Sequence, residues 1–349
     1  MSSRPGWEPA VYEHKAALIG VSPGELIASE ELLVRALIAE HETYHADALT
    51  VGVDIYNVEA EALGARLTAA TQTSCPEVVA PLWTLDSLPA RLSVPEIAEH
   101  GRFGILLDAA ARVRNALCGD AQAPRVRVAA SGPFSIATKL VGTEEALIGL
   151  VSGEQEIYRL LGFTTDYAAA WLAAIVDRQL EAVVFDSAAS PPLVSPALYR
   201  DAIAPRHRML MSLLASAGQR VRPLVLGGDT VGIVADLIGT GATSIVCDYA
   251  AHAGAFVDEV LRASTVISAD GPVAPPVTVR RNIDPAALDG DPHEPVIDGF
   301  TDDLFAFASK GIPVVIGTGI LPYSQKPEHV SAFRDRVAER YAERSAVYR

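Results

Sequence analysis

The sequence predicts an α/β fold, a (β/α)8 TIM barrel with an N-terminal helical extension. Apolar runs rich in β-branched residues alternate with helical stretches of 12 residues or more, which is typical of a parallel sheet covered on both faces. No GxGxxG or GxxxxGK[ST] motif follows these runs, so the common nucleotide-binding open sheets lack their phosphate cradle. No internal repeat or low-complexity linker divides the chain, and we expect residues 1–349 to form one domain.

The expected elements follow from hydrophobic periodicity and from breaker residues. A helix is expected over residues 23–45 and completes the extension, residues 1–45; further helical patterns cover 58–64 and about 96–118. Four prolines between residues 76 and 95 predict an irregular segment. Seven strands are expected, over 46–54, 125–130, 182–187, 222–229, 244–248, 277–284 and 313–319. The eighth strand of a closed barrel has no clear counterpart in the sequence.

Composition excludes several classes of protein. Hydrophobic residues make up 50% of the chain and charged residues 20%, so a large core is expected and disorder is not. The net charge is 28 − 43 = −15 without a basic cluster, which argues against nucleic-acid binding. Cys75, Cys118 and Cys247 show no CxxC spacing, which predicts reduced thiols in a cytoplasmic protein. No apolar run predicts a signal peptide or a membrane span.

Polar residues follow most of the predicted strands. The active site of a parallel barrel lies at the carboxyl ends of its strands, and five of the seven end at or near an acidic residue. Such a mouth suits general acid/base chemistry, a polar or cationic substrate, or a hard metal, although turns also favour Asp. The strand-end candidates are Asp54, Tyr56, Asn57, Ser131, Asp186, Ser187, Asp229, Thr230, Asp248, Asn282, Asp284 and Thr318.

Other charged residues near the strand ends have two interpretations each. Glu59 is either a mouth residue or an acid favoured by the dipole of its helix, and His252 is a site residue or a solvent-facing loop residue. Lys139 is a counter-charge for a carboxylate substrate or a solvated helix lysine. Arg280 and Arg281 interrupt an apolar strand, and strand alternation places one of them inside the barrel or at its mouth.

Six segments together resemble the uroporphyrinogen decarboxylase superfamily, which also contains corrinoid-dependent methyltransferases. They are LTVGVDIYNVEAEALG (49–64), SGPFSIATKLVG (131–142), VVFDSAASPPLVSPALYRDAIAP (183–205), VLGGDTVGIVADLIGTGATSIVCD (225–248), RRNIDPAAL (280–288) and GTGILPYSQKPEHVSAFRDRV (317–337). The resemblance spans nearly the whole chain in the same order and implies a (β/α)8 barrel. The VEAEALG segment looks more like the methyltransferase branch.

The resemblance also implies roles for individual residues and shows departures from the family. Asp54 matches the catalytic Asp of the decarboxylases and Ser187 their substrate-contacting Ser, whereas their active-site Tyr and C-terminal His fall on Lys139 and Thr318. The Arg-rich N-terminal segment that grips substrate carboxylates is absent. In the methyltransferase branch an HxCGDT motif and a later Cys bind zinc. This sequence has VLGGDT there, and no HExxH, GxSxG or Cys/His pair supports another hydrolase or zinc site.

Three functions remain open from the sequence. The first is a zinc-independent methyltransferase acting on a small methylated compound, with no tightly bound cofactor and a corrinoid presented by a partner protein. Asp54, Glu59, Asp229 and Asp248 would then be the catalytic residues. The second is a metal-free decarboxylase, a lyase that acts on a small carboxylate or a porphyrinogen-like substrate, and the third is a non-catalytic small-molecule binding protein. The residues expected to bind substrate are Tyr56, Asn57, Lys139, Asp186, Ser187, His252, Arg281, Asn282 and Thr318. A homodimer is the default expectation.

Overall fold

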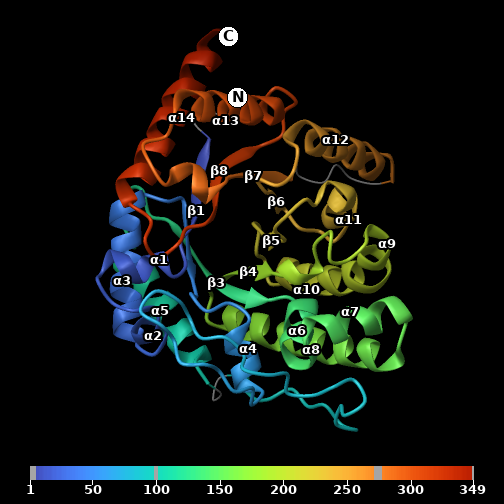
Figure 1. Ribbon diagram of the computed structural model, residues 1–349. Helices are drawn as coiled ribbons and strands as arrows, with labels where there is room; N and C mark the ends of the chain where they lie inside the picture. The colour runs from blue at the N-terminus through green and yellow to red at the C-terminus, as the bar shows by residue number, and fades with distance from the viewer. Residues whose placement is uncertain (1–4, 98–100, 271–276, 348–349) are drawn as a thin grey trace.

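The computed structural model of the chain describes residues 5–97, 101–270 and 277–347 and is built around parallel β-strands (Figure 1). All seven predicted strands are present, although residues 222–229 contribute only a two-residue strand. The strands are β1 (Gly6–Ala10), β2 (Ala48–Val51), β3 (Arg125–Ser131), β4 (Glu181–Phe185), β5 (Leu224–Val225), β6 (Ser244–Cys247), β7 (Thr278–Ile283) and β8 (Val314–Ile320). They form two four-stranded sheets, in the orders β1-β8-β7-β6 and β2-β3-β4-β5.

The eighth strand is β1, which lies inside the segment expected to be a helical extension. It pairs in parallel with β8, and the register shifts between Glu8 and Ala10, around Pro9. A proline and a carboxylate make GWEPA a poor strand pattern, which explains why the sequence does not reveal it. Glu8 is nevertheless satisfied, because its carboxylate pairs with Arg125 at 2.7 Å and with Arg127 at 2.9 Å. The prediction that residues 1–45 form a helical extension is therefore corrected, because Gly6–Ala10 form a strand that pairs with β8.

The two sheets face each other as parts of one ring, consistent with a TIM barrel whose hydrogen-bonded ladder is not continuous. A parallel bridge between Pro223 and Ser244 joins β5 to β6. At the other junction the Asp47 amide donates to the Trp7 carbonyl at 2.8 Å, and within the described ranges no strand ladder joins β1 to β2.

Helices surround the strands in Figure 1. The expected helix over residues 23–45 divides into α2 (Pro23–Ile27) and α3 (Glu30–Tyr44), because the Ser29 side chain caps the second helix by accepting from the Leu32 amide. The expected helices at 58–64 and 96–118 correspond to α4 (Asn57–Ala62) and α5 (Phe103–Ala116). The others are α1 (His14–Leu18), α6 (Pro133–Val141), α7 (Thr143–Ser152), α8 (Gln155–Asp177), α9 (Pro196–Leu198), α10 (Ala204–Ser216), α11 (Val234–Gly239), α12 (Ala253–Asp270), α13 (Glu294–Ala308) and α14 (Pro327–Val347).

The short helix α1 is packed into the body of the protein rather than lying on its surface. The His14 and Lys15 side chains are fully buried. The Lys15 ammonium lies 3.1 Å from the Glu40 carboxylate and donates to the Thr50 carbonyl at 2.7 Å. Because these partners belong to α3 and β2, the N-terminal segment is tied to the barrel by buried polar contacts as well as by β1.

Apolar side chains form two separate clusters. The larger contains most of the buried apolar side chains of the strands and helices. The smaller contains Ala10, Tyr12, Ala129, Val183 and Phe185. Within the described ranges, no helix is both long enough and apolar enough to cross a bilayer.

Candidate active site

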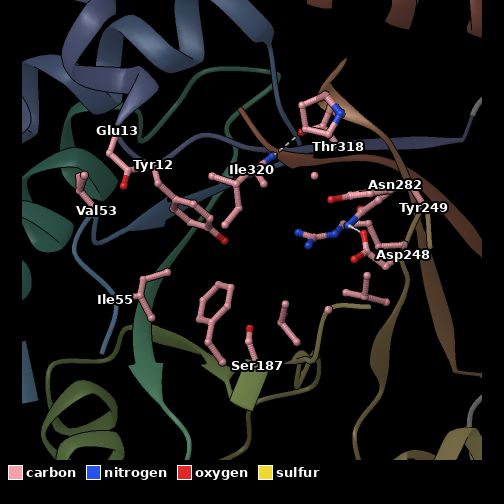
Figure 2. Close-up of a pocket in the computed structure, with 18 of the residues that line it drawn as sticks. Tyr12, Glu13, Val53, Ile55, Ser187, Asp248, Tyr249, Asn282, Thr318 and Ile320 are labelled. Atoms are coloured by element: carbon pink, nitrogen blue, oxygen red, sulfur yellow. Dashed lines mark hydrogen bonds between the residues drawn. The ribbon is translucent and has the colours of Figure 1, made fainter. Parts of the chain in front are cut away.

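A cavity of about 350 Å³ lies at the carboxyl ends of the strands, where the barrel prediction places the active site. Its walls differ in character (Figure 2). Asp248, Tyr249 and Asn282 lie on one side, and Tyr12, Val53 and Ile55 lie on the other. The cavity therefore has a polar half, built by residues on or after β6 and β7, and a half in which apolar side chains predominate, built by residues on or after β1, β2 and β4; Glu13 adds a carboxyl group to this second half.

The polar half contains a carboxylate without a cationic partner. Asp248 accepts hydrogen bonds from the Gly228 amide at 2.7 Å and from Asn282 Nδ2 at 3.1 Å, one at each carboxylate oxygen. Both donors are neutral, and none of the described residues forms an ion pair with Asp248. The Asp248 side chain is thus held in place with its charge directed to the cavity, where it can attract a cation or accept a proton.

Arg280 supplies the opposite charge in the same cavity. It is 6% exposed and lines the cavity, and it forms neither a hydrogen bond nor an ion pair with any residue that the structure describes. Its Nε is buried without a partner, as is Asn282 Oδ1. Burial lowers the pKa of the Arg280 guanidinium, yet arginine remains protonated in proteins. A buried, unpaired cation is costly, and an anionic ligand would remove that cost.

The nearby buried carboxylate of Glu8 pairs with Arg125 and Arg127 rather than with Arg280. Burial acts to raise the pKa of Glu8, but the charges of Arg127, Arg125 and Arg280 outweigh it, so that the pKa of Glu8 is lowered overall. On the adjacent position of β7, Arg281 points away from the cavity and bonds to Asp303 and to the Asp248 and Ala251 carbonyls. Strand alternation therefore separates a cavity arginine from a structural one.

The apolar half is formed largely by aromatic rings. Tyr12 and Phe185 meet edge to face with ring centroids 6.0 Å apart, and burial raises the pKa of Tyr12 to about 12. Tyr56 has φ 78°, and its hydroxyl donates to Ser187 Oγ at 2.8 Å. Aromatic faces with polar edges can hold an apolar group or a soft cation.

Five of the predicted site residues line the cavity: Tyr56, Ser187, Asp248, Asn282 and Thr318. Thr318 Oγ1 accepts from the Ala10 amide at 3.0 Å and so links β8 to the end of β1. These five share the mouth because they come from the ends of different strands, as the strand-end argument requires.

Asp54, Asn57 and Glu59 lie behind the cavity wall. The Asp54 carboxylate accepts from Arg102 at 2.5 Å and from Asn57 Nδ2 at 2.6 Å. Glu59 accepts from the Ser131 amide at 2.8 Å. Burial raises the pKa of both carboxyl groups. They border a separate void of about 10 Å³, which is about the volume that one water molecule requires, so the structure places neither beside the substrate space.

The other predicted residues also lie outside the cavity. Asp186 is fully buried and accepts from the Phe134 and Ser135 amides and from His207 Nε2. The remaining three have local roles: Lys139 pairs with Glu77, Asp229 accepts from the Val231 amide, and the His252 ring accepts from the Ala255 amide at the start of α12. Asp186 therefore fixes the backbone before Ser187, whereas the three others lie on the surface or in loops.

Tyr12, Glu13 and Tyr249 line the cavity but are missing from the sequence-based set. Tyr12 and Glu13 follow β1, so the strand-end rule would have found them had that strand been identified. Tyr249 directly follows Asp248 and is 46% exposed at the rim. Burial raises the pKa of Glu13, with Asp54 and Glu77 adding to the effect.

The cavity does not contain the donors of a zinc site. Val225 and Gly227 occupy the positions that the resemblance assigns to His and Cys ligands, and the residues described around the cavity include neither type. Throughout the described ranges, no group of three or more His, Cys, Asp or Glu residues is placed to hold a metal. Zinc prefers nitrogen and sulfur ligands, so the residues present do not fit this ion.

Residues 9–340 match the model of the uroporphyrinogen decarboxylase (URO-D) family, and the chain belongs to this family. Among solved structures, a methyltransferase from Methanosarcina mazei has a similar fold, with a TM-score of 0.76 and 18% sequence identity. The match covers 98% of this chain and 95% of that one. A comparison with curated proteins finds no relative. The family match thus places the chain in the URO-D family, and the structural match shows a shared fold.

Proposed function

We propose that this chain is a zinc-independent methyltransferase that takes a methyl group from a small methylated compound and passes it to a corrinoid on a partner protein. The observation that carries the proposal is the cavity of about 350 Å³, which is near the lower end of small-molecule sites. Arg280 is the sole lysine or arginine among the described lining residues. A tetrapyrrole with eight carboxylates would need more cations, so this cavity favours a small substrate.

The residues of the chain can bind and orient such a compound. The Arg280 guanidinium holds its anionic part, and the rings of Tyr12 and Phe185 pack against its methyl groups. The hydroxyl of Tyr12 stays protonated at neutral pH because burial raises its pKa to about 12, and it can donate to the heteroatom that loses the methyl group. A reduced corrinoid, when bound, supplies the nucleophile.

The test is a methyl-transfer assay with the purified chain. Cob(I)alamin is mixed with a panel of N-, S- and O-methylated compounds, and the corrinoid absorption spectrum is followed. Methylation of the corrinoid that requires both the protein and one substrate would support the proposal, and Arg280→Gln should slow it at least tenfold. No spectral change with any substrate, while a ligand binds and is returned unchanged, would favour a non-catalytic binding protein.

A second candidate is a metal-free decarboxylase of a small carboxylate, which the unpaired Arg280 guanidinium favours. Loss of carbon dioxide leaves an electron pair on carbon that must then take a proton. Asp54, the proton donor implied by the family resemblance, lies outside the cavity, so Asp248 or Tyr12 would have to supply this proton. Carbon dioxide release from a panel of carboxylates, with no corrinoid methylation, would favour this activity over methyl transfer.

A further inference from the structure

The cavity is lined by one cation, Arg280, and by two carboxyl groups, Asp248 on one wall and Glu13 on the opposite wall. Asp248 is 8% exposed and Arg280 6% exposed, both line the same space, and no ion pair between them is present in the structure. The Asp248 oxygens accept hydrogen bonds only from neutral donors, and Arg280 Nε has no hydrogen-bond partner. Charged side chains are almost never fully buried unless they are paired, so two charges without an ion-pair partner beside one cavity indicate that a ligand completes them.

We propose that the ligand is a small zwitterion, with a carboxylate that pairs with Arg280 and a methylated cationic centre that lies beside Asp248. That this centre carries the transferred methyl group rests on the proposed function, whereas binding of the zwitterion does not. The guanidinium offers several donors in a planar fork that matches a carboxylate. The Asp248 carboxylate, on the neighbouring strand end, sets the position of the positive charge.

The surroundings of Asp248 favour a cationic centre that carries methyl groups. Both of its oxygens already accept a hydrogen bond from a neutral donor, so a cation that attracts by charge alone suits it better than one that must donate several hydrogen bonds. The methyl groups need apolar contacts, and the rings of Tyr12, Tyr56 and Phe185 line the same cavity. Aromatic faces are a common environment for quaternary ammonium groups, and here Tyr12 lies on the wall opposite Asp248, so the cationic centre would lie between the two walls.

Three compounds of nearly equal size separate the two charges. Glycine betaine carries both the trimethylammonium group and the carboxylate. 3,3-Dimethylbutanoate has the same shape but no positive charge, and choline keeps the ammonium group but replaces the carboxylate with a hydroxymethyl group. Titration calorimetry with the full chain should show betaine binding at least tenfold more tightly than either of the others. Equal affinity of betaine and 3,3-dimethylbutanoate would overturn the cation subsite, and equal affinity of betaine and choline would overturn the anion subsite.

Two variants assign the charges to residues. Arg280→Gln should lower the affinity for betaine and for 3,3-dimethylbutanoate at least tenfold and leave the affinity for choline unchanged. Asp248→Asn should lower the affinity for betaine and for choline and leave the affinity for 3,3-dimethylbutanoate unchanged. The controls Arg35→Gln and Asp258→Asn change exposed residues and should bind all three compounds like the parent chain. Equal losses for all three compounds in either cavity variant would contradict the assignment.

Thermal unfolding distinguishes ligand binding from a structural role. Because Arg280 has no partner among the described residues, Arg280→Gln should leave Tm unchanged or raise it in the absence of ligand, whereas a large fall would show that the guanidinium stabilises the fold. Failure of betaine to bind the folded chain would overturn the inference. Betaine binding without methyl transfer would overturn the proposed function alone, and methyl transfer from an uncharged donor without betaine binding would overturn this inference alone.

Discussion

Replacing Lys15 with Met tests whether the segment before β2 is part of the folded core. The Lys15 and Glu40 side chains are 0% and 2% exposed, with the ammonium 3.1 Å from the carboxylate. Removing one member of a buried ion pair costs about 3–5 kcal/mol, because the other charge stays buried. A chain of 349 residues has an unfolding entropy of about 0.7 kcal/mol/K, so we expect Tm to fall by roughly 4–7 °C.

The size of this loss depends on pH. Burial raises the pKa of Glu40 even beside Lys15, so the native state binds this proton more tightly than the unfolded state does. The resulting stability is fully present below the unfolded glutamate pKa of about 4.3 and is lost as pH rises through the folded pKa. Without Lys15 the folded pKa rises further, so the deficit of Lys15→Met should be smaller at about pH 5 than at about pH 8.

Differential scanning fluorimetry and urea unfolding measure both effects. The double variant Lys15→Met/Glu40→Leu should recover most of the loss, because apolar residues can replace a buried ion pair at little cost. Arg178→Met is the matched control. Its partner is Asp108, the two side chains are 52% and 51% exposed, and its loss should stay below about 1 kcal/mol. A Lys15→Met variant as stable as the parent chain, or no more affected than the control, would refute the reasoning.

Asp54→Asn should lower Tm by several degrees, since it breaks a buried ion pair, but leave betaine affinity within twofold because Asp54 lies outside the cavity; calorimetry showing a larger loss would place it at the ligand. Iodoacetamide at neutral pH should alkylate the exposed Cys118 and spare Cys247, whose burial raises the thiol pKa to about 12. Peptide mass spectrometry with equal labelling of the two would contradict this. Gly317→Ala should weaken betaine binding at least tenfold, because the added Cβ would clash with Asn282 Oδ1 and would lie 2.6 Å from Arg280 Cγ; unchanged affinity would show that neither side chain is fixed there.

The sequence predicts most of the strands because their apolar, β-branched residues make them distinct. β1 is the exception, since Glu8 and Pro9 break the pattern and are accommodated by Arg125 and Arg127 and by the shift of register against β8. These are contacts between segments far apart in the chain, which a local pattern does not contain. Because β1 is not predicted, Tyr12, which follows it, is also not predicted as a site residue.

The strand-end rule predicts the site only partly, because it locates residues along a strand without giving the direction of each side chain. It selects Asp248 and Asn282, which line the cavity. It also selects Asp54, which lies outside the cavity and whose carboxylate pairs with Arg102, a residue 48 positions later in the chain. Strand alternation predicts that one of Arg280 and Arg281 faces inward, but the phase depends on the pairing of β7 with its neighbours.

The division of the cavity into halves has a consequence for how related enzymes diversify. Arg280 and Asp248 belong to β7 and to the end of β6, whereas Phe185 lies on β4 and Tyr12 follows β1. Effects of substitutions at residues that interact are not additive, and Tyr12 and Arg280 interact by charge across the cavity. A change of ligand preference among related proteins would therefore involve paired substitutions on both walls rather than one wall at a time.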